Sequence, residues 1–448
     1  MNKLVITLFS VILCIPFAVR GETSADDSLI PDLSRDETMK SAEPASTALV
    51  PAFGGWITQM FAGESKSEYS FSTSASSLRL WGRLGLGGNS FVYARVRDTY
   101  TAVLSKDNIT AKKITGGSAN DVDLDAAFVE LANARRTLQL DLGRRFFAVG
   151  SGLVVNGRGD GAEASVRSSI VDVSVFGFYT GLMDKDSNPY GLSDRDFSDG
   201  AKRVFAGGSA EKSWENQTGY IFAVVQKDYA KESLSSKRYD SQYWGLGVKG
   251  ALRCGIDYSA EGVYETGTSS ANKNPSEKSG ISAYAFTGGL SWSPDIARRP
   301  TFVLQYAFAS GDADREAPTT ASGNQYGGDG GFVPFGTCTS GYAFRPALSN
   351  LHLVRLGPTI KPFSAEMSFG ARYDLYYKAS DGAVSNYGDN AENGKSRFAG
   401  QGIDVIYRWA PYRDLSVFIN YGLFVPGRAL KESEMVRHFA AAGANIVF

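Results

Sequence analysis

The chain has 448 residues, of which 43% are hydrophobic and 12% aromatic, and it contains 50 glycines. Its 46 basic and 47 acidic residues leave a formal net charge of −1, which argues against a nucleic-acid partner. Two histidines and three cysteines without a CxxC pair argue against a metal site or a disulfide scaffold. We therefore expect no metal and no other cofactor.

The first residues have the pattern of an export signal. Lys3 precedes an apolar run from Leu4 to Ala18, and small residues follow at Val19-Arg20-Gly21. This run is too short to cross a bilayer comfortably as a helix, so residues 1–21 predict a removable signal peptide. Residues 22–53 are polar and aperiodic, which predicts a flexible periplasmic lead-in. The remaining residues, 54–448, are expected to form one domain.

In this domain apolar and polar residues alternate. Leu78, Leu80 and Leu84 occupy even positions, whereas Arg79 and Arg83 occupy odd ones. Successive side chains of a strand point to opposite faces, so one face of this strand is leucine and the other arginine. In a soluble sandwich the leucines would face a core, and in a membrane barrel they would face lipid around a polar lumen. The pattern therefore predicts an all-β protein of one of these two types.

Connection lengths favour the barrel. Counted back from Phe448, the predicted strands are separated alternately by short turns and long loops, as in an antiparallel up-and-down barrel of the outer membrane. The count is eighteen strands, or sixteen if one hairpin is mistaken. The strands are expected near 54–74, 77–86, 90–103, 124–132, 136–144, 161–167, 170–181, 202–212, 217–227, 239–252, 255–265, 281–292, 300–310, 349–360, 364–379, 401–410, 412–424 and 436–448.

The end of the chain supports the same assignment. Ala440, Ala442, Ala444, Ile446 and Phe448 share one face, and this pattern resembles the signal that the barrel-assembly machinery recognises. We therefore expect a bacterial outer-membrane barrel in contact with lipid and lipopolysaccharide. Both termini should be periplasmic, and the closed sheet should be stable as a monomer.

The two remaining cysteines test this topology. Cys254 falls in an expected periplasmic turn and Cys338 in an expected outer loop. The two sides of the membrane are about 25 Å apart, whereas a disulfide needs Cα atoms within about 7 Å. We predict no disulfide between them.

The polar face of the strands yields candidate lumen residues. Rings of arginine favour anions in pores, but such charges also pair across a wide barrel and brace its wall, and both interpretations stay open. The candidate pore-lining residues on this face are Arg79, Arg83, Arg95, Arg97, Asp141, Glu163, Arg167, Arg355, Arg372, Asp374, Asp404 and Arg408.

A family resemblance begins at Gly143-Arg144-Arg145, which is followed by a glycine-rich loop and by Asp160-Gly161. Gly402-Ile403-Asp404-Val405 and the segment 421–427 (YGLFVPG) continue it towards the end of the chain. Over residues 124–448 the chain resembles the alginate export family of outer-membrane porins. The resemblance implies an eighteen-stranded barrel with an electropositive constriction that passes a polyanionic uronate polymer. Arg144 and Arg145 match the Gly-Arg motif, and Asp160 matches the Asp-Gly motif, so the resemblance adds these three residues to the candidate pore-lining set.

The leading hypothesis is therefore a channel for a polar or anionic carbohydrate, and not an enzyme, since no Ser-His-Asp arrangement is visible. A general diffusion porin for small solutes is the alternative within this class. A plugged structural or adhesive barrel, or an enzyme on the outer face, is the alternative from another class. Asp121, Asp123 and Asp125 have the spacing of a calcium loop, but Ala126 stands where glycine is required.

Overall fold

The computed structural model describes residues 51–66, 69–107, 118–180, 182, 190–192, 196, 200–229, 238–252, 254–270, 278–384, 396–431 and 435–448. The signal peptide and nearly all of the expected lead-in lie outside these residues. Eighteen strands form in the described part of the chain. They are β1 (Pro51–Lys66), β2 (Tyr69–Gly87), β3 (Ser90–Asp107), β4 (Ser118–Ala132), β5 (Leu138–Ala148), β6 (Asn156–Val166), β7 (Asp172–Tyr179), β8 (Arg203–Trp214), β9 (Gln217–Asp228), β10 (Asp240–Leu252), β11 (Ile256–Ser270), β12 (Lys278–Trp292), β13 (Thr301–Ala309), β14 (Leu351–Ile360), β15 (Met367–Lys378), β16 (Phe398–Tyr412), β17 (Leu415–Pro426) and β18 (Arg437–Val447).

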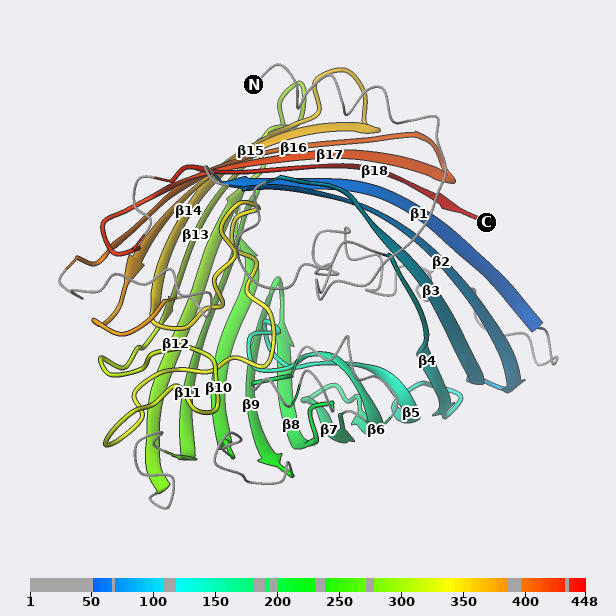
Figure 1. The fold of residues 1–448 in the computed structure, drawn as a ribbon. Helices are drawn as coiled ribbons and strands as arrows, with labels where there is room; N and C mark the ends of the chain where they lie inside the picture. The colour runs from blue at the N-terminus through cyan, green and yellow to red at the C-terminus, as the bar shows by residue number, and fades with distance from the viewer. Residues whose placement is uncertain are drawn as a thin grey trace.

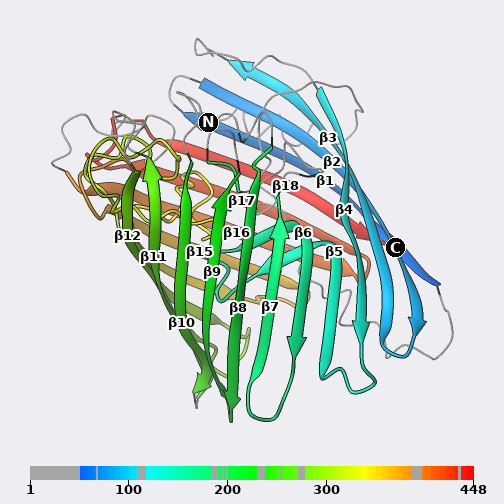
Figure 2. The same ribbon diagram turned by 90° about the horizontal axis from the view of Figure 1, so that it is seen from below.

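These strands close into a single barrel (Figures 1 and 2). Each strand pairs antiparallel with the next one along the chain. The ring closes where β1 pairs with β18. Phe448 completes the seam, since its backbone N donates to Gly55 O and its O accepts from Gly55 N, each over 2.9 Å. Closure leaves no unpaired strand edge, and the predicted eighteen-stranded up-and-down barrel is confirmed.

The leucine face predicted from alternation lies on the outside of the barrel. Leu80, Leu84 and Leu86 are 43–48% exposed, whereas Arg79 on the opposite face of β2 is 6% exposed. Leu138 and Ile446 face outwards in the same way. Alternate residues of β2 therefore divide between an apolar outer surface and a polar stretch of the interior.

Two breaks between strands lie elsewhere than the sequence predicted. The break between the first two strands, expected at 75–76, comes earlier, since β1 ends at Lys66 and β2 begins at Tyr69. The polar segment 62–76 alternates too weakly to mark its position. The turn expected at Pro411 lies instead at residues 413–414. Pro411 falls within β16, where the register with β17 is interrupted between Trp409 and Tyr412, so the proline needs no ladder hydrogen bond there.

The connections sort by length towards the two ends of the barrel. The end that carries the start of β1 and the end of β18 has the short connections, such as 88–89, 215–216 and 413–414, and is named the turn end. The other end, named the loop end, has the long connections, including 180–202, 310–350 and 379–397, and also the short β1–β2 connection at 67–68. This is the sorting that the sequence predicted.

Cys254 lies in the β10–β11 connection and Cys338 in the connection between β13 and β14, and both are free. No helix in the described part of the chain is long and apolar enough to cross a membrane.

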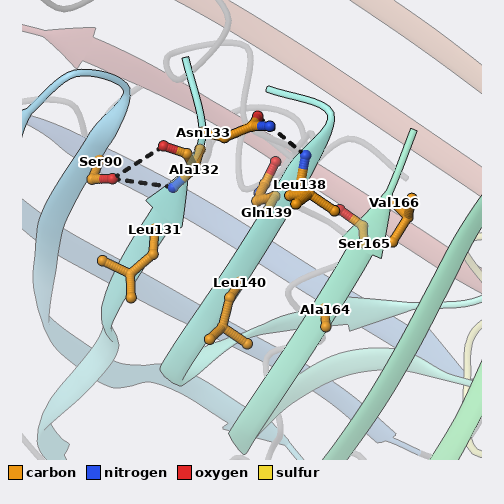
Figure 3. A pocket seen from close by; sticks show the side chains of 10 residues that line it. All are labelled: Ser90, Leu131, Ala132, Asn133, Leu138, Gln139, Leu140, Ala164, Ser165 and Val166. Atoms are coloured by element: carbon orange, nitrogen blue, oxygen red, sulfur yellow. Dashed lines mark hydrogen bonds between the residues drawn. The ribbon is translucent and has the colours of Figure 1, made fainter. Parts of the chain in front are cut away.

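The outer surface also carries a shallow hollow of about 310 Å³ between β4, β5 and β6 (Figure 3). Leu131, Leu138 and Leu140 line it. They lie on the face opposite to the buried Glu130 and Asp141, so this hollow is no part of the lumen.

Candidate functional site

The longest connection, residues 310–350 between β13 and β14, lies inside the barrel and is named the inserted loop. Phe332 and Phe335 are at most 1% exposed, and Phe335 forms a bridge with Val155 of the β5–β6 connection. In Figure 1 the yellow segment after β13 crosses in front of β9 to β12. The inserted loop packs apolar side chains against the interior of these strands, so this side of the lumen is a packed core.

A buried carboxylate anchors the inserted loop to β11. Glu265 is fully buried, and its Oε2 accepts the backbone N–H of Val333 over 2.9 Å. Its Oε1 accepts the Tyr239 hydroxyl over 2.6 Å, and the Tyr243 hydroxyl lies 3.0 Å from the same oxygen. Tyr243 also donates to the Val333 carbonyl oxygen over 2.7 Å. Burial raises the pKa of Tyr239 well above its usual value, and the neighbouring Glu265 adds to this, so the Tyr239 hydroxyl stays a proton donor.

The β5–β6 connection is anchored in a similar way, through Glu261 of β11. Ser151 donates its backbone N–H to Glu261 Oε2 and its hydroxyl to Oε1, each over 2.6 Å. The Tyr220 hydroxyl of β9 donates to the same Oε2 over 2.8 Å. A carboxylate of β11 thus holds a connection from which it is separated by five strands, β6 to β10, along the chain.

The far end of the inserted loop rests on charged side chains of β14, β15 and β16. Arg355 forms a bidentate pair with Asp374 at 2.7 and 2.9 Å and also donates to the Thr339 carbonyl over 2.9 Å. Arg372 pairs with Asp404, whose carboxylate accepts the backbone N–H of Tyr342 over 3.2 Å. Both arginines predicted from strand alternation therefore brace the wall and hold the loop.

Five arginines cross the interior face of β2, β3, β5 and β6 and are named the arginine ladder: Arg79, Arg95, Arg97, Arg144 and Arg158. Arg79 and Arg97 are directly opposite each other in the β2–β3 register. Three carboxylates, Asp123, Asp125 and Asp160, interleave with them. Within the described part of the chain, this stretch of wall therefore gathers five guanidiniums and three carboxylates.

The pairs within the ladder are close. Arg95 is paired with Asp125, and Arg158 lies 2.8 Å from Asp123 and 2.5 Å from Asp125. Arg144 pairs with Asp160 at 2.9 Å. Such contacts between buried ions hold the side chains in fixed positions along the wall.

Asp123, Asp125 and Arg158 were not among the residues predicted to line the pore. A β-bulge in the β3–β4 pairing leaves Asp125 as an extra residue opposite the step from Arg95 to Val96. Asp123 and Asp125 both face inwards before the bulge, and Ala126, Phe128 and Glu130 do so after it. The shift in phase hides this acidic pair from an alternation argument. The calcium-like spacing was the only sequence signal there, and the structure uses these carboxylates as ion-pair partners.

The other predicted pore-lining residues differ in their surroundings. Arg145 pairs with Asp141 and lies 3.2 Å from Glu163. Arg83 stacks on Phe91, with its guanidinium carbon 4.0 Å from the ring centroid. The remaining two are Arg408, half-buried in β16, and Arg167, which is exposed in the β6–β7 connection and lies outside the strand wall.

Among the described residues, no group of three or more His, Cys, Asp or Glu side chains is arranged to hold a metal ion.

A closed barrel with an apolar outer face and a charged interior is the architecture of an outer-membrane channel. The comparisons with solved structures agree with this architecture. Pseudomonas aeruginosa OccK11 (OpdR) superposes with a TM-score of 0.54 at 13% identity, over 89% of this chain and 96% of that chain.

Acinetobacter baumannii OccAB4 superposes with a TM-score of 0.55 at 9% identity, over 90% of this chain and all of that chain. At these identities the likeness concerns the fold. No curated protein matches the chain in sequence.

The family is defined by sequence. The model of the alginate export family matches residues 200–441, which is more than half of the chain, and the chain belongs to this family. It is an outer-membrane channel of bacteria. The match covers β8 to β17 and part of β18. The Gly143 to Gly161 segment, on which part of the expected resemblance depended, lies outside the matched range.

Proposed function

We propose that this channel passes an anionic carbohydrate, of the uronic-acid polymer class, across the outer membrane. The observation that carries the proposal is the arginine ladder, which gathers five guanidiniums on one stretch of the interior wall in the described part of the chain. Fixed positive charge in a narrow lumen attracts anions and repels cations. The family description, alginate export, names a cargo of this class.

The proposal includes an orientation and a state of assembly. The turn end, with both ends of the barrel sheet, faces the periplasm, and the loop end faces outwards, as short turns and long loops do in this class of barrel. The channel acts as a monomer, because the closed sheet has no open edge to pair. The barrel-assembly machinery recognises the strand that ends at Phe448.

A general diffusion porin for small solutes is the second candidate, and one observation favours it. The inserted loop fills one side of the lumen with a packed core, which narrows the path available to a polymer. A short, unbranched chain and a small solute would then both pass, so the cargo has to be tested directly.

Conductance of the purified full chain in planar bilayers tests the proposal. An anion-selective current that trimannuronate blocks, and that neutral mannotriose of equal length blocks more weakly, is the expected result. An open, weakly selective channel that trimannuronate does not block would support the general porin instead. No conductance under any condition would contradict both.

A pair of variants tests the role of charge. Arg145→Gln removes one partly exposed positive charge, and we expect the selectivity to shift towards cations. The double variant Arg144→Gln/Asp160→Asn removes an ion pair without changing the net charge, so its selectivity should stay close to that of the natural protein. Equal selectivity in all three proteins would contradict the proposed role of the wall charge.

A further inference from the structure

Four aromatic rings form a separate cluster on the interior wall, between the arginine ladder and the turn end. Trp81 of β2, Phe91 and Tyr93 of β3 and Phe128 of β4 contact one another. The ring centroids are 6.2 Å apart for Trp81 and Tyr93, which are stacked, and 5.4 Å apart for Tyr93 and Phe128. Phe91, Tyr93 and Phe128 are at most 8% exposed, whereas Trp81 is only half-buried. Trp81 is thus the accessible ring of the four.

The wall beside Trp81 leaves room for its indole. Gly54 of β1 lies next to the ring, and a Cβ at this position would be 2.9 Å from Trp81 Cζ2 and 3.1 Å from Cε2. Any side chain at Gly54 would therefore displace the indole. The glycine on one side and the buried rings on the other hold Trp81 in a fixed position.

Arg83 is the next inward-facing residue of β2, two positions from Trp81 and therefore about 7 Å away along the strand. Its guanidinium lies over the Phe91 ring, and within the described part of the chain it makes no ion pair. The nearby Arg95 and Arg97 each have an aspartate partner. Arg83 therefore offers a positive charge to the lumen that no described carboxylate neutralises.

We propose that Trp81 and Arg83 form a binding subsite for one uronate residue at the turn end of the lumen. One face of a pyranose ring is lined by C–H groups and packs on an aromatic ring, while its carboxylate matches the fork of a guanidinium. The roughly 7 Å spacing between the two side chains suits a sugar ring with its carboxylate at the edge. The subsite rests on the proposed function, because it specifies where the anionic carbohydrate first binds before it reaches the arginine ladder.

Block of the single-channel current by trimannuronate, with mannotriose as the neutral comparison, tests the subsite in the full barrel. Trp81→Leu should weaken the block by both sugars by about five- to tenfold, because both lose the aromatic face. Trp81→Phe keeps an aromatic ring and should restore part of the affinity. Arg83→Gln should weaken the block by trimannuronate by about tenfold and leave mannotriose unchanged, and Arg83→Lys should restore part of the loss.

Two matched controls separate the subsite from general effects of substitution. Trp292→Leu changes a tryptophan on the outer surface, 47% exposed, and Arg413→Gln changes an exposed arginine in the β16–β17 turn. The current through both variants should be blocked by the two sugars as strongly as that of the natural protein. Heat-modifiable mobility on gels confirms that each variant is a folded barrel before its current is measured.

The outcomes distinguish the subsite from the function on which it rests. If the natural protein is blocked by trimannuronate but Trp81→Leu and Arg83→Gln are blocked equally well, the subsite is wrong and the proposed function stands. If trimannuronate does not block the natural protein at all, both are wrong. If Arg83→Gln weakens the block by the two sugars equally, Arg83 does not bind a carboxylate, which also overturns the subsite.

Discussion

The Glu265 anchor makes a sharp prediction about the inserted loop. Replacing Glu265 by leucine puts an apolar side chain of similar size in its place and removes the acceptor of the Val333 N–H and of the Tyr239 hydroxyl. Each buried donor left without a partner costs about 1–3 kcal/mol, so the local cost is about 2–6 kcal/mol. Glu265→Gln keeps one side-chain oxygen that accepts a hydrogen bond, and its amide NH2 group can donate to a tyrosine hydroxyl oxygen. This substitution should therefore cost about 1 kcal/mol or less.

Hydrogen exchange followed by mass spectrometry measures this difference at the amide itself. In Glu265→Leu the peptide that contains Val333 should exchange at least about tenfold faster, because 1.4 kcal/mol corresponds to a factor of ten. A peptide within β13 should keep its protection, which distinguishes local release of the loop from unfolding of the barrel. The single-channel conductance should rise in the same variant, because the loop then leaves part of the lumen.

Two outcomes would refute this reasoning. Equal Val333 exchange in the leucine and glutamine variants would show that the carboxylate does not hold the loop. Faster exchange with an unchanged conductance would show that the anchored segment does not limit the current.

Three further predictions concern folding and reactivity. Arg203 is fully buried between Asp196 and Asp228, at 2.8 Å from each. Arg203→Met should therefore cost about 3–5 kcal/mol of stability and lower the temperature at which the barrel shifts in mobility on gels. Arg397→Met, at a side chain 57% exposed, should leave this temperature unchanged. Gly143→Ala should reduce the yield of folded barrel, because Gly143 has φ +129° and a Cβ would collide with the Ala127 carbonyl oxygen. Gly82→Ala serves as the control, because a Cβ at Gly82 meets open space. Burial raises the pKa of the Cys338 thiol, so less of its thiolate is present near neutral pH. Maleimide should therefore label the exposed Cys254 first, and Cys338 should react only as the pH rises. Equal labelling rates would contradict this difference between the two cysteines.

Most of the strand arrangement could be predicted because the information is local. Leu138, Leu140 and Leu142 mark an outward face within five residues of sequence, and each turn is marked by a loss of this alternation. Where alternation fails, the prediction failed too. The segment 62–76 is polar and rich in serine, so the break between the first two strands was placed too late in the sequence. Pro411 suggested a turn where the structure has an irregular ladder.

The charged interior could be predicted only in part. Alternation placed Arg79, Arg95 and Arg97 on the inner face, where they lie. It did not place Asp123 and Asp125 on the inner face, because the bulge in β4 changes which positions face inwards. A bulge depends on the pairing with a neighbouring strand, which the residues of β4 alone do not encode.

The division between apolar outside and polar inside, the number of strands and the closing strand at Phe448 all follow from the order of residues along the chain, since each depends on neighbours one or two positions apart. The path of the inserted loop and the partners of the interior charges were decided by the tertiary structure. Val333 and Glu265 are 68 positions apart, and Ser151 and Glu261 are 110 apart. No local period links residues at such separations, and they meet only because the closed barrel brings distant strands around one lumen.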